Sequence, residues 1–432
     1  MTDLIIRNAR VVDATRDDLA DVAVQSGKII DISPNIPLNI ANEFDAQGQV
    51  LFPGGIDPHV HFNEPGRTDW EGFITGTKAL AKGGMTGFFD MPLNSTPPTT
   101  TVDDFNAKQH LAEAHSLVNC YLWGGLIPGN LDYLKPLADR GVIGFKAFMS
   151  NSGMADFPAV DDYTLYRGME IIAETGKILA VHAENDGITG GLAKDAQRAG
   201  KISARDYLES RPAIAEQEAI SRAILMAEAT GCKLHIVHVS SARGVEMVMG
   251  AQARGVDVTC ETCPHYLVLT DEDVIRLGAS AKCAPPIRDA EEQAALWELV
   301  MSGDLPIIAS DHSPAPPDIK TGDDFFAIWG GISSCQSTLS LLLTFGHHQL
   351  GMSLQQITAV TSTNTANRFG LEHKGKLIEG ADADMTLVDI HASYTLTADD
   401  LEYRHKISPY IGMTLRGQVN HTWVGGEHVY GG

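Results

Sequence analysis

The middle of the chain alternates short β-strand patterns with amphipathic helical patterns, and this alternation constrains the fold more than any other feature. Short apolar runs bounded by glycine, proline or aspartate predict strands, and apolar residues at helical spacing predict helices. Strands and helices that alternate in this way form parallel βα units. Eight strands are predicted, at residues 51–62, 85–93, 120–126, 142–149, 177–184, 233–240, 256–267 and 305–313. Eight such units predict an α/β fold of the (β/α)8 TIM barrel type.

The predicted helices lie between these strands. Helical periodicity is clearest at residues 103–117, 161–175, 216–230 and 291–301, and Asp161 is placed to cap the second of these helices. Helical patterns at 336–343 and 354–369 follow the eighth strand and complete the barrel.

The two ends of the chain hold short alternating strands separated by glycine and proline, such as residues 4–6, 22–24, 383–388 and 421–424. This pattern is typical of a small β-sheet rather than of βα units. We expect the two ends to pair into one small flanking β-sandwich domain. The predicted organisation is therefore a β domain from residues 1–50 and 371–432, interrupted by a barrel over residues 51–370.

Charge and composition exclude several classes of protein. The 432 residues carry 32 basic and 55 acidic side chains, a net charge of −23 that argues against nucleic acid and anionic membranes as partners. The sequence has no apolar run long enough for a membrane span and no signal-peptide layout at its start. The spacing of Cys260 and Cys263 suits a redox or zinc pair, but without a second pair both are interpreted as structural. These features suit a cytoplasmic enzyme with a small neutral or cationic substrate, without selecting that substrate.

Ionisable residues lie near the ends of five predicted strands, where the chemistry of a TIM barrel gathers. Each has an ordinary explanation, because a buried histidine usually finds a hydrogen-bond partner and a lysine can extend to the surface. Five separate explanations of this kind are less economical than one shared metal centre. The residues are His59 and His61 on the first strand, Lys146 on the fourth, His182 on the fifth, His238 on the sixth and Asp311 on the eighth.

Lys146 determines which kind of metal site is predicted. A lysine ammonium group only donates hydrogen bonds and cannot bind a cation. If its amine reacts with CO2, the product is a carbamate (N6-carboxylysine), whose two oxygens can bridge two metal ions. We therefore predict two divalent ions, with carboxylated Lys146 between them. Zinc suits these ligands best, and iron, cobalt and manganese are alternatives. One ion is assigned His59, His61 and Asp311, and the other His182 and His238.

Three further histidines are left outside this set. His235 lies an odd number of positions from His238, so we expect it to face the helices. His265 and His312 are expected to have structural roles or to support the metal ligands.

These motifs resemble the cyclic amidohydrolase branch of the amidohydrolase superfamily, which includes dihydroorotases, hydantoinases or dihydropyrimidinases, and allantoinases. The resemblance covers nearly the whole chain and implies hydrolysis of a cyclic amide by a homo-oligomer, a dimer or a tetramer. Within the branch, four segments are most similar to the allantoinase family. They are Met91-Pro92-Leu93-Asn94-Ser95, residues 281–289, Ser310-Asp311-His312-Ser313-Pro314 and Trp329-Gly330-Gly331-Ile332.

The resemblance implies that allantoin is the substrate and that its hydantoin ring is opened to allantoate in purine catabolism. Asp311 would accept a proton from the attacking water and return it to the leaving ring nitrogen. Dihydroorotases typically carry arginine where this chain has Asn63, which favours a substrate without a carboxylate. Dihydroorotase and hydantoinase or dihydropyrimidinase activities are alternatives, and a non-catalytic scaffold on the same fold is a third. The expected substrate contacts are Asn63, Asn94, Ala284, Ser313 and Gly331, although relatives often have serine in place of Ala284.

Overall fold

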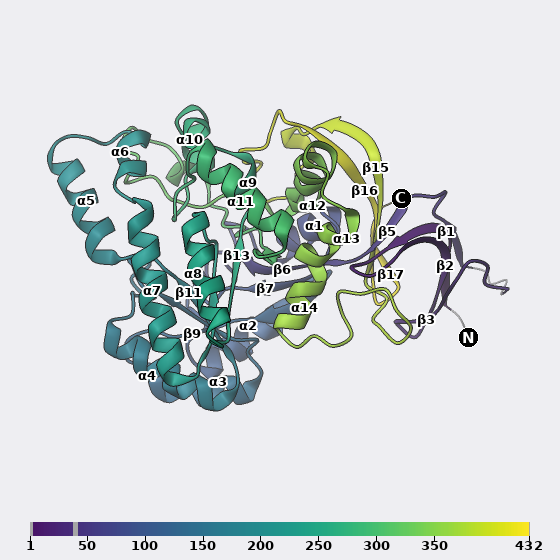
Figure 1. Ribbon diagram of the computed structural model, residues 1–432, viewed down its shortest axis with the longest axis horizontal. Helices are drawn as coiled ribbons and strands as arrows, with labels where there is room; N and C mark the ends of the chain where they lie inside the picture. Colours follow the sequence, from purple (N-terminus) through teal and green to yellow (C-terminus); the bar gives the residue numbers. More distant parts are fainter. Residues whose placement is uncertain (1–2, 38–41, 432) are drawn as a thin grey trace.

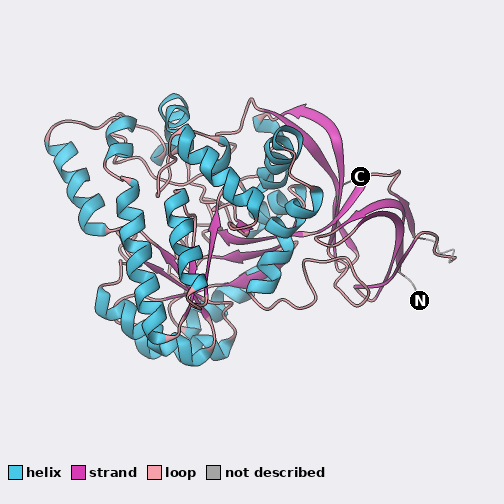
Figure 2. Ribbon diagram, in the orientation of Figure 1, coloured by secondary structure: helices cyan, strands magenta, loops and turns pink. Residues whose placement is uncertain are grey.

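The computed structural model describes residues 3–37 and 42–431. A ring of parallel strands surrounded by helices forms the larger part, and a curved sheet lies beside it (Figures 1 and 2). The first and last strands of the chain both belong to this curved sheet. None of the helices among the described residues is long and apolar enough to cross a membrane.

Two parallel sheets form the barrel wall, one in the order β6-β7-β8 and one in the order β14-β13-β12-β11-β10-β9. The strands β8 and β9 are successive parts of the third predicted strand and are separated only by Trp123. A parallel bridge between Val60 and His312 links the first strand to the segment that follows the eighth. The structure thus has the predicted α/β barrel architecture. The wall strands are β6 (Gly55–Val60), β7 (Met85–Asp90), β8 (Asn119–Leu122), β9 (Gly124–Gly125), β10 (Phe145–Phe148), β11 (Ile178–His182), β12 (Lys233–Ile236), β13 (Val258–Thr262) and β14 (Ile307–Ile308).

Helices cover the outside of the barrel wall (Figure 2). The four helices predicted most clearly are α2 (Val102–His115), α4 (Asp162–Thr175), α7 (Ala213–Thr230) and α11 (Ala290–Ser302). Asp161 caps α4 as expected, because its carboxylate accepts a hydrogen bond from the Thr164 amide at 2.7 Å. The other α-helices are α1 (Phe73–Lys82), α3 (Leu134–Arg140), α5 (Asp186–Arg198), α6 (Ala204–Glu209), α8 (Ala242–Ala253), α9 (Pro264–Val268), α10 (Asp271–Leu277), α12 (Thr338–Leu341), α13 (Leu354–Thr358) and α14 (Asn364–Arg368).

The helical segments after the eighth strand are partly π-helical, in η5 (Leu342–Gln349) and η6 (Ala359–Thr363). The seventh predicted strand was too long: β13 ends at Thr262, and helix α9 follows at once. Pro264 explains this boundary, because its fixed φ suits the first position of a helix and it cannot donate to a sheet.

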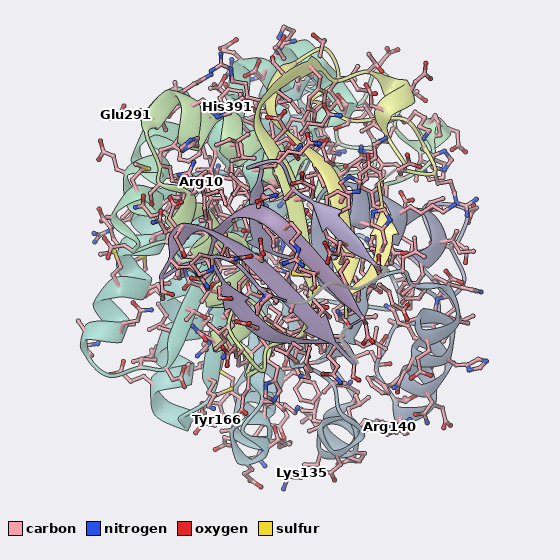
Figure 3. The ribbon with its side chains drawn as sticks, turned by 90° about the vertical axis from the view of Figure 1, so that its right-hand side faces the viewer. Arg10, Lys135, Arg140, Tyr166, Glu291 and His391 are labelled. Carbon is pink, nitrogen blue, oxygen red and sulfur yellow. The ribbon has the colours of Figure 1, made fainter. Side chains whose placement is uncertain are left out.

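The two ends of the chain form one mixed sheet in the order β17-β16-β15-β5-β1-β2-β3, with β4 beside β1. Figure 3 looks onto this sheet, in which the N-terminal strands carry Arg10. Apolar side chains from β1, β2, β5, β15 and β16 share one buried cluster, as expected for a sheet that curves around its own core. Its strands are β1 (Leu4–Val12), β2 (Asp17–Gln25), β3 (Lys28–Ser33), β4 (Glu43–Asp45), β5 (Val50–Pro53), β15 (Met385–Thr395), β16 (Thr414–Val424) and β17 (Glu427–Tyr430).

One strand predicted over residues 51–62 is in fact two strands in two sheets. The first, β5, pairs with β1 and β15 in the flanking sheet, whereas β6 starts the barrel. Gly54 separates them where the backbone passes close to a neighbouring strand, since a Cβ atom there would lie 2.1 Å from Thr86 Oγ1. The chain therefore passes directly from the flanking sheet into the strand that carries His59.

Candidate metal centre

The first and last barrel strands bring three of the predicted ligands together. His59 Nε2 lies 3.3 Å from Asp311 Oδ1, and His61 Nε2 lies 3.4 Å from the same oxygen. The backbone fixes this arrangement, because the His61 amide donates to the His312 carbonyl at 2.7 Å. These three side chains have donor atoms within 4.8 Å of one another, so they could hold a cation together.

Asp311 and His238 lie beyond the ends of their strands in a backbone conformation that is rare for residues other than glycine. Asp311 has φ 44° and His238 has φ 41°. Such conformations cost free energy and are concentrated at functional sites. In both cases the turn that follows the strand directs the side chain into the site.

The fifth and sixth strands supply a second pair of imidazoles. His182 Nδ1 lies 3.0 Å from His238 Nε2, so these nitrogens share a hydrogen bond. The Phe148 ring stacks on the His182 ring at a centroid distance of 4.4 Å. The two groups of histidines adjoin, because the rings of His59 and His238 are 5.3 Å apart.

Lys146 is fully buried on β10, and its Nζ has no hydrogen-bond partner among the described residues. Burial lowers the pKa of this amine to about 7, although Glu261 and Asp311 raise it. Burial also lowers the pKa of His59, His182 and His238, and the charge of Lys146 lowers each further. An unpartnered amine among imidazoles is costly as an ammonium ion. The buried site therefore disfavours Lys146 as a free ammonium group.

Two buried carboxylates that the sequence analysis missed contact the histidines from behind. Glu261 Oε1 lies 2.7 Å from His59 Nδ1, and Glu184 Oε2 lies 3.0 Å from His182 Nε2. Burial raises the pKa of Glu261 to about 8, although Lys146 lowers it. Burial also raises the pKa of Glu184, but Arg211 and His182 outweigh this and bring it to about 2. Like Lys146, Glu261 is a charged residue within a buried strand, and this signal is visible in the sequence.

His235 was assigned to the wrong side of the barrel wall. Its Nε2 lies 3.0 Å from Glu261 Oε2, and Glu261 in turn contacts His59, so His235 faces the barrel interior. The parity argument failed because β12 ends at Ile236 and His238 lies in the turn beyond it. His312 has a structural contact, since its Nδ1 accepts a hydrogen bond from the Ser334 amide at 3.1 Å. His265 is buried, and its ring nitrogens have no partner among the described residues.

A cavity of about 460 Å³ opens above the histidines. Four of the predicted substrate contacts line it: Asn94, Ala284, Ser313 and Gly331. Asn63 is buried with its Nδ2 3.4 Å from the Pro314 carbonyl, and it is not among the described residues that line the cavity. This position does not favour the direct substrate contact expected of Asn63.

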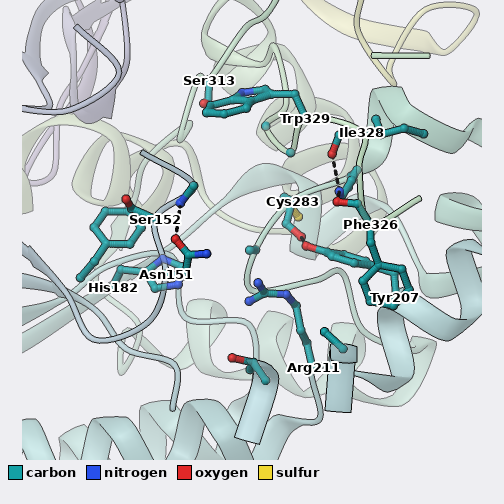
Figure 4. Close-up of a pocket in the computed structure, with 18 of the residues that line it drawn as sticks. Asn151, Ser152, His182, Tyr207, Arg211, Cys283, Ser313, Phe326, Ile328 and Trp329 are labelled. Carbon is teal, nitrogen blue, oxygen red and sulfur yellow. Dashed lines mark hydrogen bonds between the residues drawn. The ribbon is translucent and has the colours of Figure 1, made fainter. Parts of the chain in front are cut away.

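Polar and aromatic side chains from several segments line the cavity (Figure 4). Asn151 and His182 lie on one side, Tyr207 and Phe326 lie on the other, and the Arg211 guanidinium points between them. Gly331, with φ 134°, lies so close to Ser313 that a Cβ atom would be 2.3 Å from the Ser313 carbonyl oxygen. The cavity therefore offers hydrogen-bonding groups on several sides beside the candidate metal ligands.

Comparison with known proteins defines the class. The sequence profile of the Amidohydrolase family matches residues 50–429, so the chain belongs to the Amidohydrolase family.

Particular relatives narrow this class. The chain is 52% identical over 430 residues to a protein named allantoinase from Rubrobacter xylanophilus, covering 100% of this chain and 94% of that protein. It is 51% identical to the allantoinase of Solibacter usitatus, with the same coverage of both chains. The solved structure of L-hydantoinase (dihydropyrimidinase) from Arthrobacter aurescens has a TM-score of 0.97 and 35% identity, covering 100% of this chain and 96% of that one.

Proposed function

We propose that the protein hydrolyses the ring amide of allantoin to allantoate. One observation carries this proposal: the chain is 51–52% identical to proteins named allantoinase over its full length, a range that spans every segment that lines the cavity. The cluster formed by His59, His61 and Asp311 fits the metal-dependent chemistry of such an enzyme.

The predicted set of ligands is consistent with two divalent metal ions. His59, His61 and Asp311 would hold one ion, and His182 and His238 would hold the other, with carboxylated Lys146 between them. The lowered pKa of Lys146 supports the modification, because a neutral amine can attack CO2, form an N–C bond and release one proton. Nitrogen and oxygen donors of this kind suit zinc, and also iron, cobalt and manganese.

In the proposed hydrolysis, bound metal would activate water and Asp311 would transfer the proton. Bound metal would supply a water of lowered pKa and would polarise the ring carbonyl. Asp311 lines the cavity, so its carboxylate can accept the proton of the attacking water. As the carbon–nitrogen bond of the ring breaks, Asp311 returns that proton to the leaving nitrogen. The products of this step are the new carboxylate and the freed ureide nitrogen.

Substrate contacts are proposed for the residues that line the cavity beside Asp311. Asn94 Nδ2 lies 3.5 Å from Ser313 Oγ, so these two side chains form one polar edge. Gly331 packs against Ser313 in this edge, and a larger residue would clash because its Cβ atom would lie 2.3 Å from the Ser313 carbonyl oxygen. The backbone around Ala284 would complete the contacts from the opposite segment.

Hydantoinase activity is the second candidate, favoured by the close structural likeness to the L-hydantoinase. Allantoin differs from simple hydantoins by a polar ureido group on the ring, which needs hydrogen-bond partners when it is buried. Asn151, Gln197 and Arg211 line the cavity and can supply such partners. This polar lining favours allantoin over hydantoins that carry apolar substituents.

Steady-state assays of the metal-loaded protein test this proposal. We expect kcat/KM for allantoin to exceed the values for a 5-alkylhydantoin and for dihydroorotate, with about two ions bound per chain. Faster turnover of the alkylhydantoin would overturn the choice of substrate. A protein that binds no metal and hydrolyses none of the three would support the non-catalytic scaffold.

Several predictions about organisation accompany this function. We propose that the two ends of the chain, predicted as residues 1–50 and 371–432, form a flanking β-sandwich domain beside the barrel. Its first boundary lies at Gly54 rather than at residue 50, because β5 pairs in the flanking sheet. The homo-oligomer of two or four copies and the cytoplasmic location stay predictions. Light scattering and cell fractionation test them.

A further inference from the structure

A chain of four side chains runs from the candidate metal ligand His59 into the barrel wall. Glu261 on β13 is 1% exposed, and its Oε1 lies 2.7 Å from His59 Nδ1. Its other oxygen, Oε2, lies 3.0 Å from His235 Nε2. At the far end, His235 Nδ1 lies 2.7 Å from Thr259 Oγ1. These four side chains thus connect β6, β13 and β12 through contacts of 2.7–3.0 Å.

When Glu261 is ionised, hydrogen-bond chemistry fixes the direction of every contact in this series of side chains. An ionised carboxylate only accepts hydrogen bonds, and a neutral imidazole carries one N–H. His59 must therefore hold its hydrogen on Nδ1, and His235 must hold its hydrogen on Nε2. The remaining nitrogen of His235 then accepts from the Thr259 hydroxyl. The remaining nitrogen of His59 is Nε2, which faces Asp311 Oδ1 at 3.3 Å with a free lone pair.

We propose that Glu261 is a positioning residue that holds His59 in the tautomer and ring orientation a metal ligand requires, and that His235 and Thr259 hold Glu261 in turn. The proposal rests on the metal-dependent function proposed above. Positive charge at the centre favours the ionised form of Glu261, which strengthens the contact. A carboxylate in this position also raises the basicity of the imidazole it contacts.

The alternative is that Glu261 only ties strands together. A second carboxylate–imidazole pair in the same protein separates these two roles. Glu64 is buried and its Oε1 lies 3.2 Å from His115 Nδ1, but His115 lies on helix α2 on the outside of the barrel. Replacing Glu64 removes a similar pair without touching a predicted ligand. Glu64→Gln is therefore the matched control for Glu261→Gln.

The test is metal binding by metal-stripped protein, measured without substrate. Zn²⁺ is titrated against a chelating indicator, and Co²⁺ binding is followed by absorption spectroscopy. For Glu261→Gln we expect one of the two binding events to weaken by about 10–100-fold, the usual effect of losing such a partner. The Co²⁺ spectrum should change as well, because an amide cannot accept from both imidazoles. Glu64→Gln should match wild type in both measurements.

The outcomes separate this proposal from the proposed function. Wild-type protein that binds no metal would refute the function. Wild-type protein that binds two ions, with Glu261→Gln binding them equally tightly and with an unchanged spectrum, would refute the positioning role alone. If Glu261→Gln does not fold, His235→Gln carries the test, with weaker binding of one ion expected and unchanged binding overturning the proposal.

Discussion

The two groups of histidines in the site are held in different ways. His59 and His61 face the Asp311 carboxylate, with each Nε2 3.3–3.4 Å from Asp311 Oδ1, and these atoms are placed to share a cation. His182 and His238 instead contact each other through a hydrogen bond of 3.0 Å. The first group is thus incomplete without a cation, whereas the second satisfies part of its own hydrogen-bonding needs. We expect the first group to bind metal more tightly, because the second must give up a hydrogen bond.

The two groups of histidines also contact different kinds of carboxylate, Glu261 in the first group and Glu184 in the second. Glu184 pairs with Arg211, whose charge is permanent, whereas Glu261 contacts two imidazoles. The second group is therefore anchored by an ion pair that exists with or without metal. The first group depends on a chain of hydrogen bonds that a bound cation would strengthen. The predictions below test this contrast.

Removing the residue shared by both groups should have the largest effect. Lys146→Ala deletes the only predicted ligand between the two ions, so we expect allantoin hydrolysis to fall below detection and metal content to drop. Added acetate should restore part of the activity, because its carboxylate can enter the space that the side chain leaves. Activity close to wild type in Lys146→Ala would show that no bridging carbamate is needed.

Asp311 belongs to the first group only, so its loss should separate binding from chemistry. For Asp311→Asn we expect kcat to fall by about 10²–10⁴-fold, the usual contribution of a general acid or base. The tighter metal-binding event should weaken, since the amide lacks charge, while the second event should change little. Rate measurements on protein with both sites filled check the prediction. A kcat near that of wild type under these conditions would exclude Asp311 as the proton carrier.

The stability of the metal-free protein should distinguish the two carboxylates. Glu184→Gln leaves the partly exposed Arg211 guanidinium without its buried charged partner, so we expect a loss of about 2 kcal/mol in the free energy of unfolding. Glu261→Gln exchanges hydrogen bonds to neutral imidazoles, so its loss should be about 1 kcal/mol. Urea unfolding of both variants in the presence of a chelator gives the comparison. Equal losses would mean that the two groups are anchored alike.

The candidate ligands, though not the contrast between them, could be predicted from the sequence, because one rule about barrels placed ionisable residues from five strands at the same rim. The structure brings His59, His61, His182, His238 and Asp311 to one cavity, as that rule requires. Strand alternation is a reliable guide only within a strand. It failed for His235 because the comparison with His238 crossed the end of β12 into a turn with positive φ.

Other features depended on contacts that no local pattern reveals. The continuous apolar run around Gly54 concealed the change of sheet, which follows from pairing with β1 and β15. The role of Glu261 depends on contacts with His59 and His235, which lie on other strands and far away in the sequence. Asn63 is expected to contact substrate only from the resemblance to dihydroorotases, which have arginine there. In the structure it has a φ of 64°, and its Nδ2 lies 3.4 Å from the Pro314 carbonyl.

We expect the smallest effect on metal affinity from Thr259, the last residue in the hydrogen-bonded series behind His59. Thr259→Val keeps the shape of the side chain but removes the hydroxyl that donates to His235 Nδ1. One neutral hydrogen bond contributes about 1 kcal/mol, so the affinity for one ion should fall by at most about fivefold. Thr262→Val is the control, since Thr262 lies on the same strand but donates to the Val239 carbonyl. If Thr259→Val weakens binding of one ion and Thr262→Val does not, the effect travels through His235 and Glu261 to the metal. If the two variants bind the metal ions with equal affinity, the Thr259 hydroxyl does not influence the metal site. The residues that support His59 then end at Glu261.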